Sequence, residues 1–155
     1  GNTAEFEAAG AALDENSVAL GDAITSVYGE EAGAAFLDQW RAHIGLFVDY
    51  TTATAAGDED GKAAAVEGLG SYISDFAAFL AEATGLPVEA LETGLQEHVM
   101  GLAAAVDAQA ADDATTAYHD LRAAYLHMQT LGDALSTAIA GRFPEMFPSE
   151  GTAGG

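Results

Sequence analysis

Residues 36–57 read FLDQWRAHIGLFVDYTTATAAG, and this stretch decides the fold class. Its bulky side chains recur every three or four positions, which is the spacing of one face of an α-helix. The glycine at its end, Gly57, favours the left-handed conformation that closes many helices. The stretch therefore predicts a long helix that packs one face into a core, through Phe36, Trp40, His43, Phe47 and Tyr50.

The same periodicity continues on both sides, and short runs rich in glycine, aspartate or proline interrupt it. These interruptions predict five helices, over residues 3–28, 32–56, 60–84, 87–111 and 114–141. Connections this short force neighbouring helices to run antiparallel. We therefore expect an all-α, antiparallel up-and-down bundle of four to five long helices. The bundle domain is predicted over residues 3–146, and a flexible tail over residues 147–155.

The chain also carries an internal hairpin duplication. The segment around His43 aligns with the segment around His98 at a shift of 55 residues, and Leu20-Gly-Asp-Ala aligns with Leu131-Gly-Asp-Ala at a shift of 111. The repeating unit is therefore a helical hairpin of about 55 residues, in which helices one, three and five are copies. By this alignment, the given chain begins in the middle of a repeating unit. We therefore expect a homo-oligomer in which a second subunit completes an incomplete N-terminal hairpin.

Charge and composition exclude several classes of partner. The 155 residues include 25 acidic and only 4 basic side chains, for a formal net charge of −21. We expect no nucleic-acid binding, which requires a positive surface, and no membrane insertion, because no charge-free apolar run is long enough. The absence of cysteine excludes thiolate ligands and cysteine nucleophiles. A surface this acidic suits a secreted or extracytoplasmic protein.

Polar residues interrupt the predicted core faces at a single height. Asn16, His43 and His98 occupy positions in the apolar stripes of helices one, two and four. Counting residues from the turns brings Tyr72 and His127 to the same level of the bundle. Because helices two and four lie diagonally in such a bundle, we expect His43 and His98 to point at each other across the core.

A metal ion would satisfy these imidazoles. A buried polar group without a partner costs about 1–3 kcal/mol, so facing core histidines need something to bind. The predicted ligands are His43 and His98, completed by His127 or Met128. Imidazole and thioether donors without thiolates favour copper, with zinc as the alternative metal. The side chains expected to orient the imidazole N–H groups are Asn16, Tyr72, Asp75, Glu97 and Asp133.

The sequence leaves three functions open. The first is an extracytoplasmic bundle that binds copper for sequestration or delivery, without catalysis because no nucleophile or phosphate loop is evident. The second is a non-catalytic structural or interaction module, in which the two histidines are hydrogen-bonded within the core and the acidic surface meets a basic partner. The third is haem held between the two histidines and approached over Gly45, Gly94 and Gly101.

Two stretches resemble a known class of domain. Residues 40–51 (WRAHIGLFVDYT) and the segment Gly132-Asp-Ala-Leu135 with Phe143-Pro144 look like repeated helical-hairpin domains of secreted proteins from high-GC Gram-positive bacteria. The resemblance covers residues 3–147 and carries no established activity. It implies the bundle fold and an extracytoplasmic setting, and it names no ligand.

Overall fold

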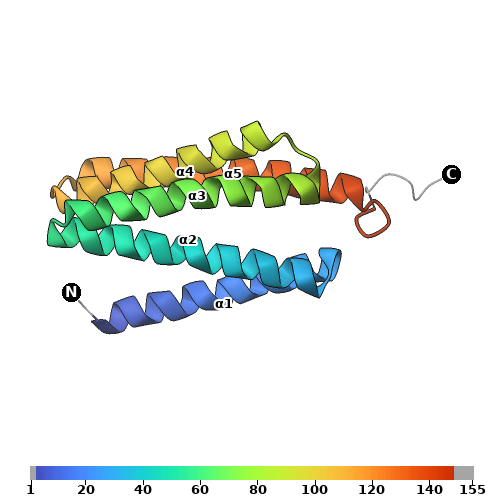
Figure 1. The fold of residues 1–155 in the computed structure, drawn as a ribbon, viewed down its shortest axis with the longest axis horizontal. Coiled ribbons are helices and arrows are strands. Elements are labelled where there is room, and N and C mark those ends of the chain that lie inside the picture. Colours follow the sequence, from blue (N-terminus) through green and yellow to red (C-terminus); the bar gives the residue numbers. More distant parts are fainter. Residues whose placement is uncertain (1–2, 149–155) are drawn as a thin grey trace.

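The computed structural model describes residues 3–148, which form five long helices and no strand (Figure 1). Successive helices run antiparallel, so the predicted all-α up-and-down bundle is confirmed. Every helix begins and ends within two residues of its predicted limits. Within the described chain, none of these helices is apolar enough over a sufficient length to cross a bilayer. The helices are α1 (Thr3–Tyr28), α2 (Glu30–Ala56), α3 (Glu59–Thr84), α4 (Val88–Ala110) and α5 (Ala114–Arg142).

Local sequence explains where the helices stop and start. Gly57 and Gly85 follow α2 and α3 in the left-handed conformation, with φ of 67° and 77°, which a glycine adopts without steric cost. Asp58 and Asp113 cap α3 and α5, each accepting a hydrogen bond from a backbone N–H three residues later, at 3.0 and 3.1 Å. Most of the predicted flexible tail, residues 149–155, lies outside the described residues.

The hydrophobic core lies between α2, α3 and α4. α3 is the central helix, because it packs against α2 and α4 and also touches α5. Burying a large apolar side chain contributes about 1.5–3 kcal/mol, so this cluster is the main source of stability. α2 and α5 do not pack closely on each other, which leaves an open seam between them. The buried cluster comprises Phe36, Tyr72, Phe76, Ala77, Leu80, Leu91 and Leu95.

α1 packs differently from the other helices. It lies along α2 at the outside of the bundle, and its N-terminal half is exposed, with Phe6 67% and Leu13 43% accessible (Figure 1). Its C-terminal half is better packed, around the buried Ser17. The Tyr28 hydroxyl anchors this end by donating a hydrogen bond to the Ala83 carbonyl of α3 (2.9 Å). The core bundle is therefore α2–α5, and α1 is a fifth helix added beside α2.

Candidate functional site

His43 lies in an aromatic environment between α2 and α3. Its ring stacks on Tyr72, with centroids 4.9 Å apart and planes 17° apart, and it meets the Trp40 ring edge-on at 4.6 Å. The Nδ1 atom of His43 is buried and has no hydrogen-bond partner among residues 3–148. Tyr72 therefore stands beside this imidazole as predicted, but it contacts the face of the ring.

Burial keeps the His43 imidazole neutral. Its pKa is lowered from 6.5 to about 4, mainly by desolvation, with a smaller contribution from charge repulsion by His98. Polar contact with the backbone of Trp40 and Gln39 raises the pKa, but the effect of burial is larger. At neutral pH the ring therefore keeps an unprotonated nitrogen, which is the form that binds a metal ion or accepts a hydrogen bond.

His98 is the repeat-related residue on α4, and burial also keeps its imidazole neutral. Burial lowers its pKa, the backbone at Ala124 of α5 opposes this shift, and His127 adds to it. Its Nδ1 atom is also buried without a partner in the described part of the chain. The charge on His98 also acts on the pKa of His43, and α2 contacts α4, so the two predicted imidazoles lie in neighbouring parts of the core.

His127 already has protein partners. Its Nε2 lies 2.9 Å from the Gly94 carbonyl oxygen, and since a carbonyl can only accept, this nitrogen must donate its proton. Its Nδ1 lies 3.4 Å from a carboxylate oxygen of Glu97. His127 therefore faces the part of α4 that carries His98 and acts on the pKa of His98, while its Nε2 is engaged by the α4 backbone.

The remaining predicted residues are not gathered around the imidazoles. The core position expected for Asn16 is wrong: Asn16 is exposed, whereas its neighbour Ser17 is buried, so the packed face of α1 lies one residue away from the predicted apolar stripe. Asp75 and Asp133 are also exposed, and neither makes a hydrogen bond to an imidazole in the described structure. Met128 is half-buried and lines a large apolar cleft.

The predicted ligands do not form a closed metal cluster. Among residues 3–148, no group of three or more histidine, aspartate or glutamate side chains is arranged to hold a metal ion. What the structure provides is a pair of neutral imidazoles, His43 and His98, each with a buried Nδ1 that lacks a partner. His127 lies beside this pair and is tied to Gly94.

The sequence did not predict the cleft on which Met128 lies. The cleft has a volume of about 1020 Å³ and opens between α1, α2, α3 and α5, with Leu95 of α4 contributing. The indole N–H of Trp40, which lines it, is buried and has no partner in the described chain. The signal that could have revealed it is the combination of large rings on α2 and α3 with small residues on α1, α2 and α5. These residues are Phe36, Trp40, Phe76, Phe79, Ala23, Ala32, Ala35 and Gly132.

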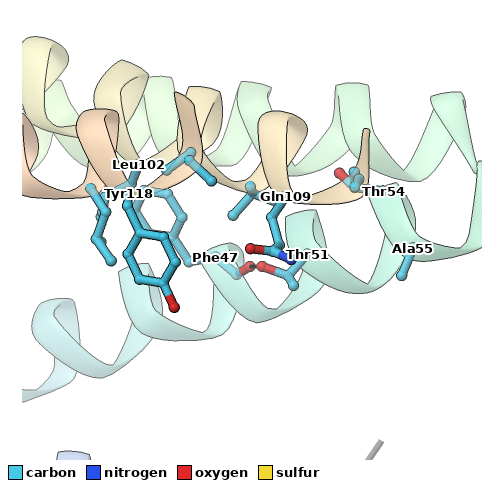
Figure 2. A pocket seen from close by; sticks show the side chains of 12 residues that line it. Phe47, Thr51, Thr54, Ala55, Leu102, Gln109 and Tyr118 are labelled. Atoms are coloured by element: carbon cyan, nitrogen blue, oxygen red, sulfur yellow. Dashed lines mark hydrogen bonds between the residues drawn. The ribbon is translucent and has the colours of Figure 1, made fainter. Parts of the chain in front are cut away.

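A second hollow lies on the same α2–α5 seam, toward the end where α4 meets α5. Figure 2 shows this groove, with Phe47, Leu102 and Tyr118 on one side and Thr51 and Gln109 pointing into the same space. Its volume is about 650 Å³. The exposed N-terminal half of α1 does not line it, so this part of the seam stays uncovered.

No family model, curated protein or solved structure matches this chain. The resemblance to repeated hairpin domains of secreted bacterial proteins therefore stays a prediction, as do the homo-oligomer and the extracytoplasmic setting.

Proposed function

We propose that this protein binds a copper ion through His43 and His98, for sequestration or delivery outside the cytoplasm. The observation that supports this proposal is that both imidazoles have a buried Nδ1 without a hydrogen-bond partner in residues 3–148. Leaving such a group unpaired costs about 1–3 kcal/mol, and two repeat-related residues carry this cost in one region of the core. A metal ion shared by the two rings would remove it from both.

The protonation state of the pair supports metal binding. A metal ion binds the neutral imidazole, so protons compete with it wherever the histidine is charged. The pKa of His43 is about 4, and burial also lowers the pKa of His98. Both rings are therefore ready to coordinate at neutral pH without releasing a proton.

The number and type of nearby donors favour copper over zinc. Structural zinc sites use four protein ligands and catalytic zinc sites use three. No group of three histidine or carboxylate ligands is present in the described residues. Imidazole and thioether donors are suited to copper, so the third ligand we propose is Met128 of α5, whose side chain would have to turn from the cleft that it lines toward the imidazoles. His127 would have to give up its hydrogen bond to Gly94 before its Nε2 could coordinate.

Haem has less support than copper. Axial ligation would require the two imidazoles to face one slot wide enough for a macrocycle. Neither His43 nor His98 lines the large cleft or the groove of Figure 2. The structural alternative, an interaction module whose core imidazoles are satisfied by hydrogen bonds without a metal, predicts a protein that gains no stability from copper.

Titration with copper(I) under reducing conditions, against a chromogenic copper(I) chelator, tests the proposal. We expect one tightly bound copper per chain, and about 2.7 kcal/mol of added stability when free copper is a hundred times Kd. The double variant His43→Asn, His98→Asn should lose both effects. Its matched control is His119→Asn, since His119 is exposed on α5 and contacts Asp120.

Two outcomes would contradict copper binding by this pair. One is a folded double variant that takes up copper as tightly as the wild type, which would point to acidic surface sites. The other is a wild-type protein that binds none. If the double variant does not fold, each single variant still serves, because each should remove one imidazole from the X-ray absorption spectrum of the copper-loaded protein.

A further inference from the structure

We propose that the groove of Figure 2 binds an amphipathic helix of a partner protein, whose lysine and arginine side chains face the acidic turns at one end of the groove. The groove lies between α2, α4 and α5. None of its lining residues is a proposed copper ligand, so this proposal does not rest on copper binding.

The groove is largely apolar and open to solvent. Its lining spans residues 47–55 on α2 and 102–110 on α4, which is about 12 Å, or about two helical turns, of each helix. On α5, Tyr118 and Leu121 line it and are both exposed. Apolar side chains that stay accessible along a concave surface are typical of a groove that receives the apolar face of a partner helix.

The other end of the same seam shows which kind of element covers it. There, Leu20, Ala23 and Ile24 of α1 line the large cleft together with Leu131 of α5. Their spacing of i, i+3 and i+4 is that of one face of a helix. Because α2 and α5 continue from the cleft to the groove, a helix placed end to end with this half of α1 would cover the groove in the same way. The occupant is therefore a helix with apolar residues at this spacing.

Negative charge surrounds the end of the groove nearest the α2–α3 and α4–α5 turns. The single lysine of the chain, Lys62, lies near these turns but is already paired with Asp107, at 2.7 Å. The C-terminal ends of α2 and α4 add a partial negative charge, and neither has a basic residue in its last turn. Basic side chains on a partner helix are therefore favoured at this end. The exposed carboxylates in or beside the two turns are Asp58, Glu59, Asp60, Asp112 and Asp113.

The same charge disfavours the occupant that the chain itself could supply. The N-terminal half of α1 exposes Phe6 and Leu13, but residues 3–16 carry four acidic side chains and no basic one. Like charges oppose the approach of this segment to the acidic turns, whether it belongs to the same chain or to a second copy. The partner must instead bring positive charge.

Arg122 marks the limit of the acidic region. It is exposed on α5 beside Leu121, and it makes no ion pair within residues 3–148. It lies about 14 Å along the helix from Asp113, farther than the Debye length of about 8 Å at physiological ionic strength. Arg122 therefore does not neutralise the turns, and an acidic residue of the partner near it would fix the direction of the bound helix.

Fluorescence anisotropy with three labelled peptides tests the proposal on the whole chain. The first peptide has about 14 residues, or about 21 Å of helix, and consists of lysine and alanine with leucine at every third or fourth position. The second has the same composition with its leucines distributed around the helix, and the third replaces each lysine by glutamate. We expect the first to bind about tenfold more tightly than either of the others, because only it matches both the apolar groove and the acidic turns.

Two matched leucine variants locate the binding surface. Leu121 lines the groove and is 48% exposed, whereas Leu126 lies on the same helix, is 47% exposed and lines neither hollow. Leu121→Ser should weaken binding of the first peptide about tenfold, and Leu126→Ser should weaken it less than about twofold. Thr51→Lys adds a cation to the groove and should also weaken binding. It serves if Leu121→Ser does not fold, because Thr51 is exposed and bonds only to its own helix.

Two triple variants test the acidic turns. Removing three carboxylates beside the groove should weaken binding of the first peptide about fivefold. Removing three exposed carboxylates at the opposite end of the bundle should change it less than about twofold, because those charges are screened. The groove set is Glu59→Gln, Asp60→Asn and Asp112→Asn, and the control set is Glu30→Gln, Glu89→Gln and Glu145→Gln.

Three results would overturn this assignment. The first is equal affinity for the first and second peptides, which would show attraction to the acidic surface without a groove. The second is unchanged binding in the folded Leu121→Ser and Thr51→Lys variants. The third is tighter binding of the acidic peptide, or a dimer in high salt that Leu121→Ser abolishes, which would identify α1 of a second copy as the occupant. The variant with both His43 and His98 replaced by asparagine should retain peptide binding, so failure of the copper site and failure of the groove are distinguishable.

Discussion

The hairpins α1–α2 and α4–α5 each combine one helix of either repeat type, since α1 resembles α5 and α2 resembles α4, yet the two hairpins pack to different extents. α4 and α5 stay close along their length: a Cβ on Gly101 would lie 3.2 Å from the Ala124 Cβ, and Ala105 and Ala117 are buried. α1 and α2 approach closely near their turn, where a Cβ on Gly33 would lie 2.9 Å from the Gly21 carbonyl oxygen. Farther from the turn, α1 becomes exposed.

This difference shows that a duplicated sequence need not produce duplicated packing. α5 touches α3 as well as α4, whereas α1 packs mainly on α2. A helix with one neighbour buries one narrow stripe, so its other apolar residues stay accessible, as Phe6 does. The copies therefore share their helical periodicity but not their burial.

The largest expected contrast between the hairpins comes from truncating one leucine in each. Leu91 of α4 is 1% exposed, so Leu91→Ala should cost about 2–5 kcal/mol through lost burial and a cavity. Leu13 of α1 is far more exposed, so Leu13→Ala should cost less than about 1 kcal/mol. Urea unfolding midpoints measure both, and similar losses would show that the N-terminal half of α1 is packed in solution.

A second comparison concerns the pH dependence of stability that the buried histidines of α2 and α4 produce. His43 has a pKa of about 4 in the folded state against 6.5 in the unfolded chain, so the unfolded chain binds the proton more readily. Its contribution to stability is complete above about pH 6.5 and is lost as the pH falls toward 4, by an amount on the order of 3 kcal/mol.

Unfolding midpoints measured between pH 7.5 and pH 4.5 check this expectation. His43→Asn should flatten the profile, leaving the smaller slope that the lowered pKa of His98 supplies. The exposed His119→Asn variant, which serves as the control, should follow the wild type. A His43→Asn profile as steep as that of the wild type would show that His43 is accessible to solvent.

The smallest expected effect comes from adding one methyl group to each hairpin. A Cβ on Gly10 of α1 would meet nothing within 4 Å, so Gly10→Ala should stabilise by about 0.5–1 kcal/mol through helix propensity alone. Gly101→Ala should gain less than this, because its Cβ would crowd Ala124. Equal gains in thermal midpoint would mean that α4 and α5 are farther apart than the structure places them.

Part of the candidate site was predictable from residue counting. Counting residues from the turns predicted two neighbouring pairs, His43 with Tyr72 and His98 with His127, because helical rise is constant and the connections are short. The prediction for Asn16 was wrong because the packed face of α1 runs through Ser17 and Gly21, which leaves Asn16 on the exposed side of the helix. The hydrogen bond from His127 to Gly94 was not predictable, since it depends on how closely α5 approaches the backbone of α4.

The sequence by itself determined the elements: five helices, their limits and their antiparallel order. Local rules act over a few residues, such as the glycine that ends α2 and the aspartate that caps α3. Only the tertiary structure decided which apolar faces are covered, and therefore where the cleft lies and which polar atoms lack partners. Those properties depend on distances between helices far apart in the chain, and helical periodicity does not encode those distances.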